Sequence, residues 1–237
     1  VMGANVYHVF KEGEPRTPNV RKVKKRDLEY ERYNAAIELN QNSRAVALHK
    51  KSKLVPGPEI FPFKKILFFL EPLVNQLGGT TAGLGTQKDY VIFEGGAAKV
   101  GPAICYESAY GEYVGGYVRN GAELIFVMTN DGWWDDTPGY RQHLYFSSLR
   151  AIETRRDIVR AANTGSSAFV NQRGDILQKT AYDVPIAIAA EMHKNSEITF
   201  YTKWGDMIAR IALFLSIIMV LNTIVKSRMK DQTVLEE

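Results

Sequence analysis

An apolar stretch near the C-terminus, residues 207–225 (MIARIALFLSIIMVLNTIV), constrains the fold of this chain more than any other feature. Fifteen of its nineteen residues are apolar, and its one charged residue, Arg210, lies near one end. Because about 20 apolar residues span a bilayer, the stretch predicts a transmembrane helix rather than a buried core helix. Tyr201 and Trp204 precede it, as in an aromatic belt. The basic residues that follow are Lys226, Arg228 and Lys230.

Positive charge after a membrane helix predicts that the C-terminus is cytoplasmic. The sequence before the helix would then face the other side of the membrane.

Short strands and helices alternate through the rest of the chain, which predicts a layered α/β fold. Hydrophobic patterning predicts strands at residues 1–10, 33–39, 45–49, 91–93, 99–104, 123–129, 158–162 and 167–170. It predicts helices at residues 63–77, 110–120 and 142–157. Residues 50–62 are predicted to form a loop because their three prolines disfavour both a helix and a central strand.

Composition narrows the class of protein. With 45% hydrophobic residues in 237, the chain can bury a sizeable core, which excludes intrinsic disorder. The net charge of +4 is too small to indicate nucleic-acid binding. Six basic residues between Arg16 and Arg26 predict a solvated hairpin loop, with an anionic membrane surface as the alternative. The single cysteine excludes an internal disulfide and a multi-cysteine metal site.

That cysteine, Cys105, lies where a predicted strand (VGPAI) ends and the polar sequence CYES begins. A nucleophile at a turn from a strand into a helix projects beyond the sheet, near backbone N–H groups that can stabilise an oxyanion. A lone cysteine can equally be a small buried hydrophobe, so position alone leaves both readings open. The four histidines are scattered without metal-ligand spacing and are interpreted as structural.

The combination of motifs is more specific than any one of them. It comprises HKKSKLVPGPEIFP, ICYES, TNDGWW and QHLYFSSLRAIETRRDIVRAANTGSSAFVNQRGDIL. Together these resemble the nitrilase-like domain of the bacterial apolipoprotein N-acyltransferase family, and more loosely all nitrilase-like carbon–nitrogen hydrolases. The resemblance covers essentially the whole chain and implies an α-β-β-α sandwich followed by one transmembrane helix. Its implied division is residues 1–200 for the nitrilase-like domain and 201–230 for the helix with its basic flank.

The resemblance also implies roles for individual residues. Cys105 matches the family's nucleophile. Lys51 matches the catalytic lysine before the LVP loop, with Lys53 as the second choice. Glu59 matches the loop glutamate that the family needs for activity.

Two further residues match the family around the nucleophile. Tyr106 would offer its backbone N–H to the oxyanion, and Glu107 would order the pocket; an aromatic core residue and a structural carboxylate are the alternatives. The family's general-base glutamate would lie upstream of Val1, since Glu12 and Glu14 lie in the wrong place. The nitrilase-like domain is therefore expected to be N-terminally incomplete. Neither a metal nor a cofactor is implied.

The implied activity is transfer of a fatty acyl chain from a phospholipid, through a cysteine thioester, to the N-terminal amine of a diacylglyceryl-cysteine lipoprotein. The expected setting is a monomer in the bacterial inner membrane, with its catalytic domain on the periplasmic face. Apolar loop residues such as the adjacent Trp133 and Trp134 suit lipid substrates. Two alternatives remain: a nitrilase-like amidase or hydrolase, and a catalytically incomplete, membrane-tethered module that binds lipid or lipoprotein.

Overall fold

The first sheet is built from the N-terminal part of the chain. The computed structural model describes residues 1–23, 28–40, 46–60, 69 and 83–235. A long central strand, β3, pairs antiparallel with β1 along one edge and with β2 and β4 along the other. The four strands are β1 (Met2–Val9), β2 (Arg21–Val23), β3 (Leu28–Glu38) and β4 (Ala47–Lys50).

The second sheet has five strands in chain order. They are β5 (Val100–Ile104), β6 (Leu124–Thr129), β7 (Ile158–Ala162), β8 (Ala168–Val170) and β9 (Ile176–Lys179). The first three are parallel and the last two antiparallel. Two helices supply the crossovers between the parallel strands, α2 (Gly111–Arg119) and α3 (Pro138–Thr154). β5 is buried at every position, as expected for a parallel strand covered on both faces.

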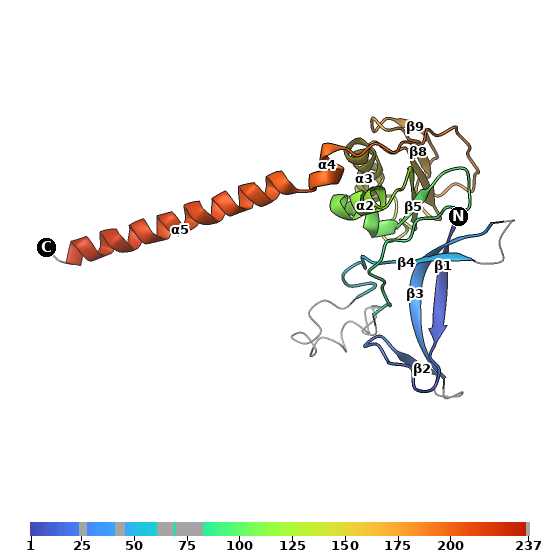
Figure 1. Ribbon diagram of the computed structural model, residues 1–237, viewed down its shortest axis with the longest axis horizontal. Coiled ribbons are helices and arrows are strands. Elements are labelled where there is room, and N and C mark those ends of the chain that lie inside the picture. Colours follow the sequence, from blue (N-terminus) through green and yellow to red (C-terminus); the bar gives the residue numbers. More distant parts are fainter. Residues whose placement is uncertain (24–27, 41–45, 61–68, 70–82, 236–237) are drawn as a thin grey trace.

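Two hydrophobic clusters define the layers. One packs β3 of the first sheet against β5 and β6 of the second, with Ala36, Phe93 and Ile104 at its centre. The other lies on the opposite face of the second sheet, where Tyr117 of α2 and Ile158 of β7 belong to one cluster between the helices and the sheet. The described chain therefore has a helix layer followed by two sheet layers, as Figure 1 shows.

The layered α/β prediction is confirmed, with local corrections. β3 begins at Leu28, five residues before the strand predicted at 33–39, and β2 is a short strand inside the predicted hairpin loop.

The next two corrections concern residues 91–93 and the start of α3. Residues 91–93 are not a strand, because only Phe93 forms a bridge, to Val100. α3 begins four residues earlier than predicted: Thr137 caps it by accepting a hydrogen bond from the Gly139 N–H, and Pro138 fits the first turn. The helix predicted at residues 63–77 lies outside the described residues, apart from position 69.

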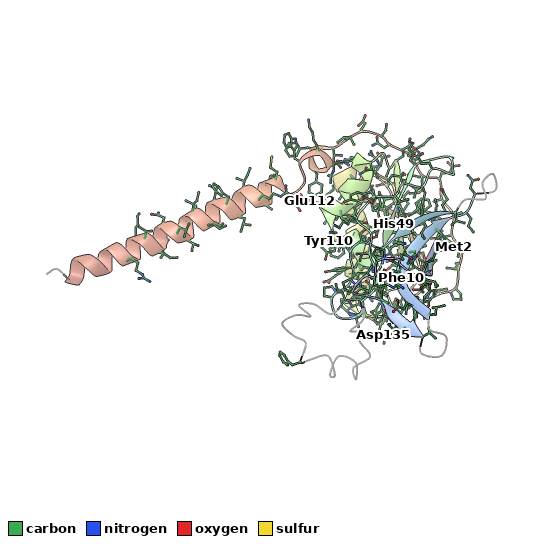
Figure 2. The ribbon with its side chains drawn as sticks, turned by 60° about the horizontal axis from the view of Figure 1, so that its bottom comes forward. Met2, Phe10, His49, Tyr110, Glu112 and Asp135 are labelled. Carbon is green, nitrogen blue, oxygen red and sulfur yellow. The ribbon has the colours of Figure 1, made fainter. Side chains whose placement is uncertain are left out.

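A long helix, α5 (Met207–Leu235), follows the short α4 (Phe200–Trp204) and projects away from the α/β body (Figure 1). Its segment Met207–Lys226 has a mean hydropathy of 2.3, and none of it is buried against the rest of the protein. By length and composition this helix can cross a bilayer. The Glu112 carboxylate ties its start to α2 by pairing with Arg210 and accepting the Asp206 N–H, and Figure 2 places Glu112 on the side of the body where the helix begins.

Candidate active site

Cys105 occupies a strained turn at the end of β5. It is the first residue of a short 3-10 helix, η2 (Cys105–Ala109), and its φ of 52° lies in the left-handed region that favours glycine. Two side chains hold its carbonyl oxygen: the Ser108 hydroxyl donates to it at 2.7 Å, and His143 Nε2 lies 3.1 Å away. Strain of this kind persists where the surroundings over-determine it, which is typical of functional sites.

The half-buried Cys105 lines a cavity of about 640 Å³ between the two sheets. One wall comes from the first sheet and the loop after it, and the other comes from the carboxyl ends of β5, β6 and β7, where α/β sheets bind ligands. The lining includes Val1, Met2, Asn34, Lys51, Glu59, Cys105, Met128, Asn130, Trp133 and Asn163. Apolar and polar groups thus meet around the sulfur.

A buried ion pair lies in the same cavity. Lys51, only 1% exposed, directly follows β4, and its Nζ donates to both carboxylate oxygens of Glu59 at 2.9 and 2.8 Å. Glu59 also accepts hydrogen bonds from the Asn34 amide and the Val55 N–H. A buried ammonium needs such a partner, and the pair is therefore fixed in position.

Lys53 lies elsewhere. Its exposed side chain places Nζ 5.6 Å from the centre of the Tyr113 ring and lines a second cavity of about 440 Å³, together with Arg119 and Asp206. Of the two candidate lysines, Lys51 shares a cavity with Cys105.

Glu107 joins the lysine segment to the cysteine turn. Its fully buried carboxylate accepts the backbone N–H groups of Ser52 at 2.6 Å, Lys53 at 3.3 Å and Ile104 at 2.7 Å. One side chain thus bonds residues directly after Lys51 and directly before Cys105. Charge-assisted bonds of this kind are stronger than neutral ones, so Glu107 sets the spacing of the two segments.

An aromatic cluster surrounds that carboxylate. His49, completely buried, contacts Tyr117 through Nε2 at 2.8 Å and Gln87 through Nδ1 at 2.9 Å. Burial, followed by the negative charge of Glu107, raises the pKa of Tyr113 and Tyr117, so both phenols stay protonated. His49 is therefore held in the interior by structural contacts.

The aromatic residues near the nucleophile take separate places. The half-buried Tyr106 packs its ring edge-on against Tyr110 at 5.2 Å, and burial together with the hydrogen bond to Tyr106 raises the pKa of Tyr110 to about 12. Trp133 is 73% exposed and lines the cavity, whereas the Trp134 ring lies 5.2 Å from that of His143. The two tryptophans therefore lie in different places, and Trp133 gives the cavity an apolar rim.

Three ionisable side chains behind Cys105 were missed by the sequence reasoning. His143 Nδ1 lies 2.7 Å from Asp131 Oδ1, and Arg160 Nη2 donates to Asp131 Oδ2 at 2.6 Å. Burial alone would raise the pKa of Asp131, but His143 and Arg160 outweigh it and hold that pKa below its ordinary value. A charged residue at an inward-facing position of the buried strand IVRAA was the signal that could have found this group.

The cavity thus brings together three of the predicted residues, Cys105, Lys51 and Glu59. Tyr106 and Glu107 lie on the same turn as the cysteine. Glu14 lies in the turn after β1, 2.7 Å from His8, and is not part of the cavity lining.

Comparison with known proteins gives a consistent result. The sequence profile described as carbon-nitrogen hydrolase matches residues 17–190. The chain is 31% identical over 204 residues to the apolipoprotein N-acyltransferase of Chlorobaculum tepidum, covering 84% of this chain and 38% of that protein. It is 37% identical over 153 residues to the protein of that name from Brucella suis, covering 64% of this chain and 28% of that protein. The chain therefore spans only 28–38% of the length of these relatives.

Among solved structures, the chain is similar to Saccharomyces cerevisiae Nit3, described as a member of branch 10 of the nitrilase superfamily. The identity is 18% and the TM-score 0.47, with 69% of this chain and 54% of that chain covered. The glutamine-dependent NAD+ synthetase from Acinetobacter baumannii gives 16% identity and a TM-score of 0.49, with 70% and 28% covered.

Proposed function

The chain belongs to the carbon–nitrogen hydrolase family, and from that premise we propose that it is the catalytic part of an apolipoprotein N-acyltransferase, with Cys105 as nucleophile. One observation carries the proposal. The cysteine, in a left-handed turn, shares a cavity with the buried ammonium of Lys51. Relatives named apolipoprotein N-acyltransferase, 30–37% identical, favour acyl transfer over hydrolysis.

The first half-reaction forms the acyl-enzyme. A proton acceptor takes the thiol proton, and the sulfur attacks an ester carbonyl of a phospholipid. The Lys51 ammonium and the Tyr106 N–H stabilise the tetrahedral oxyanion, with each such donor contributing about 3 kcal/mol. When the oxyanion collapses, the ester C–O bond breaks, the leaving alkoxide takes up the proton removed from the thiol and departs as a lysophospholipid, and a thioester remains on Cys105. Glu59 holds the lysine and Glu107 fixes the turn.

The second half-reaction transfers the chain. The free α-amine of a diacylglyceryl-cysteine attacks the thioester carbonyl, the C–S bond breaks and an amide forms, while the amine proton is lost and the thiol is restored. The covalent intermediate separates the two substrates in time, so ping-pong kinetics follow. The exposed Trp133 and the apolar Val1, Met2 and Met128 supply a surface for the acyl chain.

The proposal includes a membrane setting. Residues 1–200 form the nitrilase-like domain, and residues 201–230 form a membrane helix with a basic cytoplasmic flank. The domain then works as a monomer on the periplasmic face of the inner membrane, where both lipid substrates reach it without crossing water. The unburied apolar surface of α5 supports this arrangement.

The deciding experiment is a choice of acceptor. The protein, expressed from its gene and kept in membranes, is given a phospholipid with a labelled acyl chain and a diacylglyceryl-cysteine peptide with a free N-terminus. We expect label in amide linkage on the peptide, and none on a matched peptide whose amine is acetylated.

Release of the label only as free fatty acid, at the same rate with and without the free amine, would instead assign a hydrolase. Cleavage of small amides without any lipid acyl transfer would assign an amidase.

A further inference from the structure

Behind Cys105, three buried ionisable side chains take no part in the acyl transfer described above. Asp131, His143 and Arg160 are 0%, 2% and 2% exposed. They come from the segment after β6, from α3 and from β7, which converge beneath the turn that carries the cysteine. Burying ionised groups is unfavourable unless they are paired, so the cluster calls for an explanation.

His143 connects the cluster to the backbone of the nucleophile. Its Nε2 lies 3.1 Å from the Cys105 carbonyl oxygen and also 3.1 Å from Ser108 Oγ, while Nδ1 lies 2.7 Å from Asp131. A left-handed non-glycine residue is strained and needs its surroundings to hold it. Contacts on this carbonyl fix the turn and with it the direction of the sulfur.

Two of the three guanidinium nitrogens of Arg160 are buried without a hydrogen-bond acceptor among the described residues. Its Nη2 donates to Asp131 and lies 3.2 Å from His143 Nδ1, but within the described residues no acceptor receives a hydrogen bond from its Nε or Nη1. Burial lowers the pKa of Arg160, and the charges of Asp131 and Cys105 both act in the opposite direction. Unpaired buried donors are stabilised when negative charge develops beside them.

We propose that Asp131, His143 and Arg160 are positioning residues for Cys105: His143 holds the carbonyl of the strained turn, Asp131 orients the imidazole and the guanidinium, and Arg160 stabilises negative charge on the sulfur. The proposal rests on the proposed role of Cys105 as nucleophile. Other charged groups also face this region. Lys51 and Glu59 line the cavity from the first sheet, and Glu107 lies on the cysteine's own turn.

The test is alkylation of Cys105 by iodoacetamide in the intact protein from about pH 5 to about pH 10, because the thiolate is the reacting form. The peptide containing Cys105 is quantified by mass spectrometry. Arg160→Met is expected to move the pH profile upward by about one unit and to slow alkylation at neutral pH about tenfold, since loss of a nearby positive charge disfavours the thiolate. Arg160→Lys keeps the charge and most of the rate. Arg173→Met, at an exposed arginine of the β8–β9 turn, is the matched control with a wild-type profile.

A second pair of variants isolates the turn. His143→Leu removes the contact with the Cys105 carbonyl and is expected to lower the alkylation rate even at high pH. His143→Gln, which keeps a donor, restores most of that rate.

A wild-type profile in folded Arg160→Met would overturn the proposal. If that variant does not fold, equal rates for His143→Leu and His143→Gln overturn it. Alkylation uses no lipid, so a failed acyl transfer accompanied by the expected alkylation pattern would reject the proposed function and leave the positioning unit intact.

Discussion

At the scale of single residues, the two lysines before the LVP loop give a sharp comparison. Lys51 is buried, forms an ion pair with Glu59 and lines the same cavity as Cys105. Lys53 is exposed, and its ammonium lies over the ring of Tyr113. Lys51→Ala removes the ammonium that would face the oxyanion, so we expect formation of the acyl-enzyme to slow about 100-fold or more. Lys53→Ala should stay near wild type. Labelling with an acyl phospholipid in a single turnover measures both.

The control for that pair is Lys179→Ala, at a lysine of β9 that borders neither of these cavities. Strong loss of labelling in Lys53→Ala with full labelling in Lys51→Ala would show that the alignment of the lysine is displaced by two residues.

Glu107 should affect stability as well as activity. The two oxygens of its carboxylate accept hydrogen bonds from three backbone N–H groups in two segments. Glutamine replaces these two charged oxygens by one neutral acceptor oxygen. We expect Glu107→Gln to lower the free energy of unfolding by about 2 kcal/mol, measured by thermal denaturation. The matched control is Glu94→Gln, at an exposed carboxylate that forms an ion pair with Lys99. It should change the free energy of unfolding by less than about 0.5 kcal/mol. Equal effects of the two substitutions would mean that Glu107 does not bind the segments together.

Asp131 predicts a dependence of stability on pH. Its pKa in the folded protein lies below the ordinary value of 3.8, so it stabilises the fold above that value and loses the effect as pH falls through its folded pKa. The melting temperature of Asp131→Asn should therefore lie well below wild type at neutral pH and approach it below about pH 4. A gap that stays constant with pH would contradict this assignment.

Some of these residues could be predicted from the sequence, and others could not. The resemblance of the loop and ICYES motifs led to Lys51, Glu59 and Cys105, which lie on one cavity. It did not lead to His143, because a lone histidine on an amphipathic helix carries no spacing signal. Its contacts with Asp131 and Cys105 exist only after α3 packs against β7 and the cysteine turn η2.

At the scale of elements, α5 predicts a membrane topology. Basic residues after an apolar helix orient it with its C-terminus in the cytoplasm. We expect a fluorescent protein fused after Glu237 to be protected from external protease in spheroplasts. The matched variant replaces Lys226, Arg228 and Lys230 by glutamine, which should weaken that orientation. Digestion of the fusion in intact spheroplasts would show that the C-terminus lies outside the cytoplasm and would contradict this prediction.

The elements best predicted from sequence were those formed by continuous apolar segments. β5 and β6 are continuous apolar runs, and α5 is apolar on all sides over Met207–Lys226. The failure at residues 91–93 has the opposite cause, since an apolar run forms a ladder only if a neighbour pairs with it, and there just one bridge forms. The early start of α3 depends on Thr137 and Pro138, whose capping lies outside hydrophobic periodicity.

At the scale of the whole molecule, the candidate site exists because two sheets meet. The lysine follows β4 of one sheet and the cysteine follows β5 of the other, and about fifty residues of sequence separate them. Glu107 bonds the two segments directly. The layered class could be read from the alternation of elements, but the order of strands and the packing of one sheet on the other could not, because neither leaves a local pattern.

The most direct test of this arrangement is detection of the acyl-enzyme itself. The protein in membranes is given a phospholipid with a labelled acyl chain and no acceptor, and the peptide containing Cys105 is examined by mass spectrometry. We predict a hydroxylamine-sensitive acyl group on Cys105 that disappears when a diacylglyceryl-cysteine peptide is added and never forms in Cys105→Ser. Acyl label that persists in Cys105→Ser, or that sits on another residue, would contradict the assignment of this sulfur as the carrier.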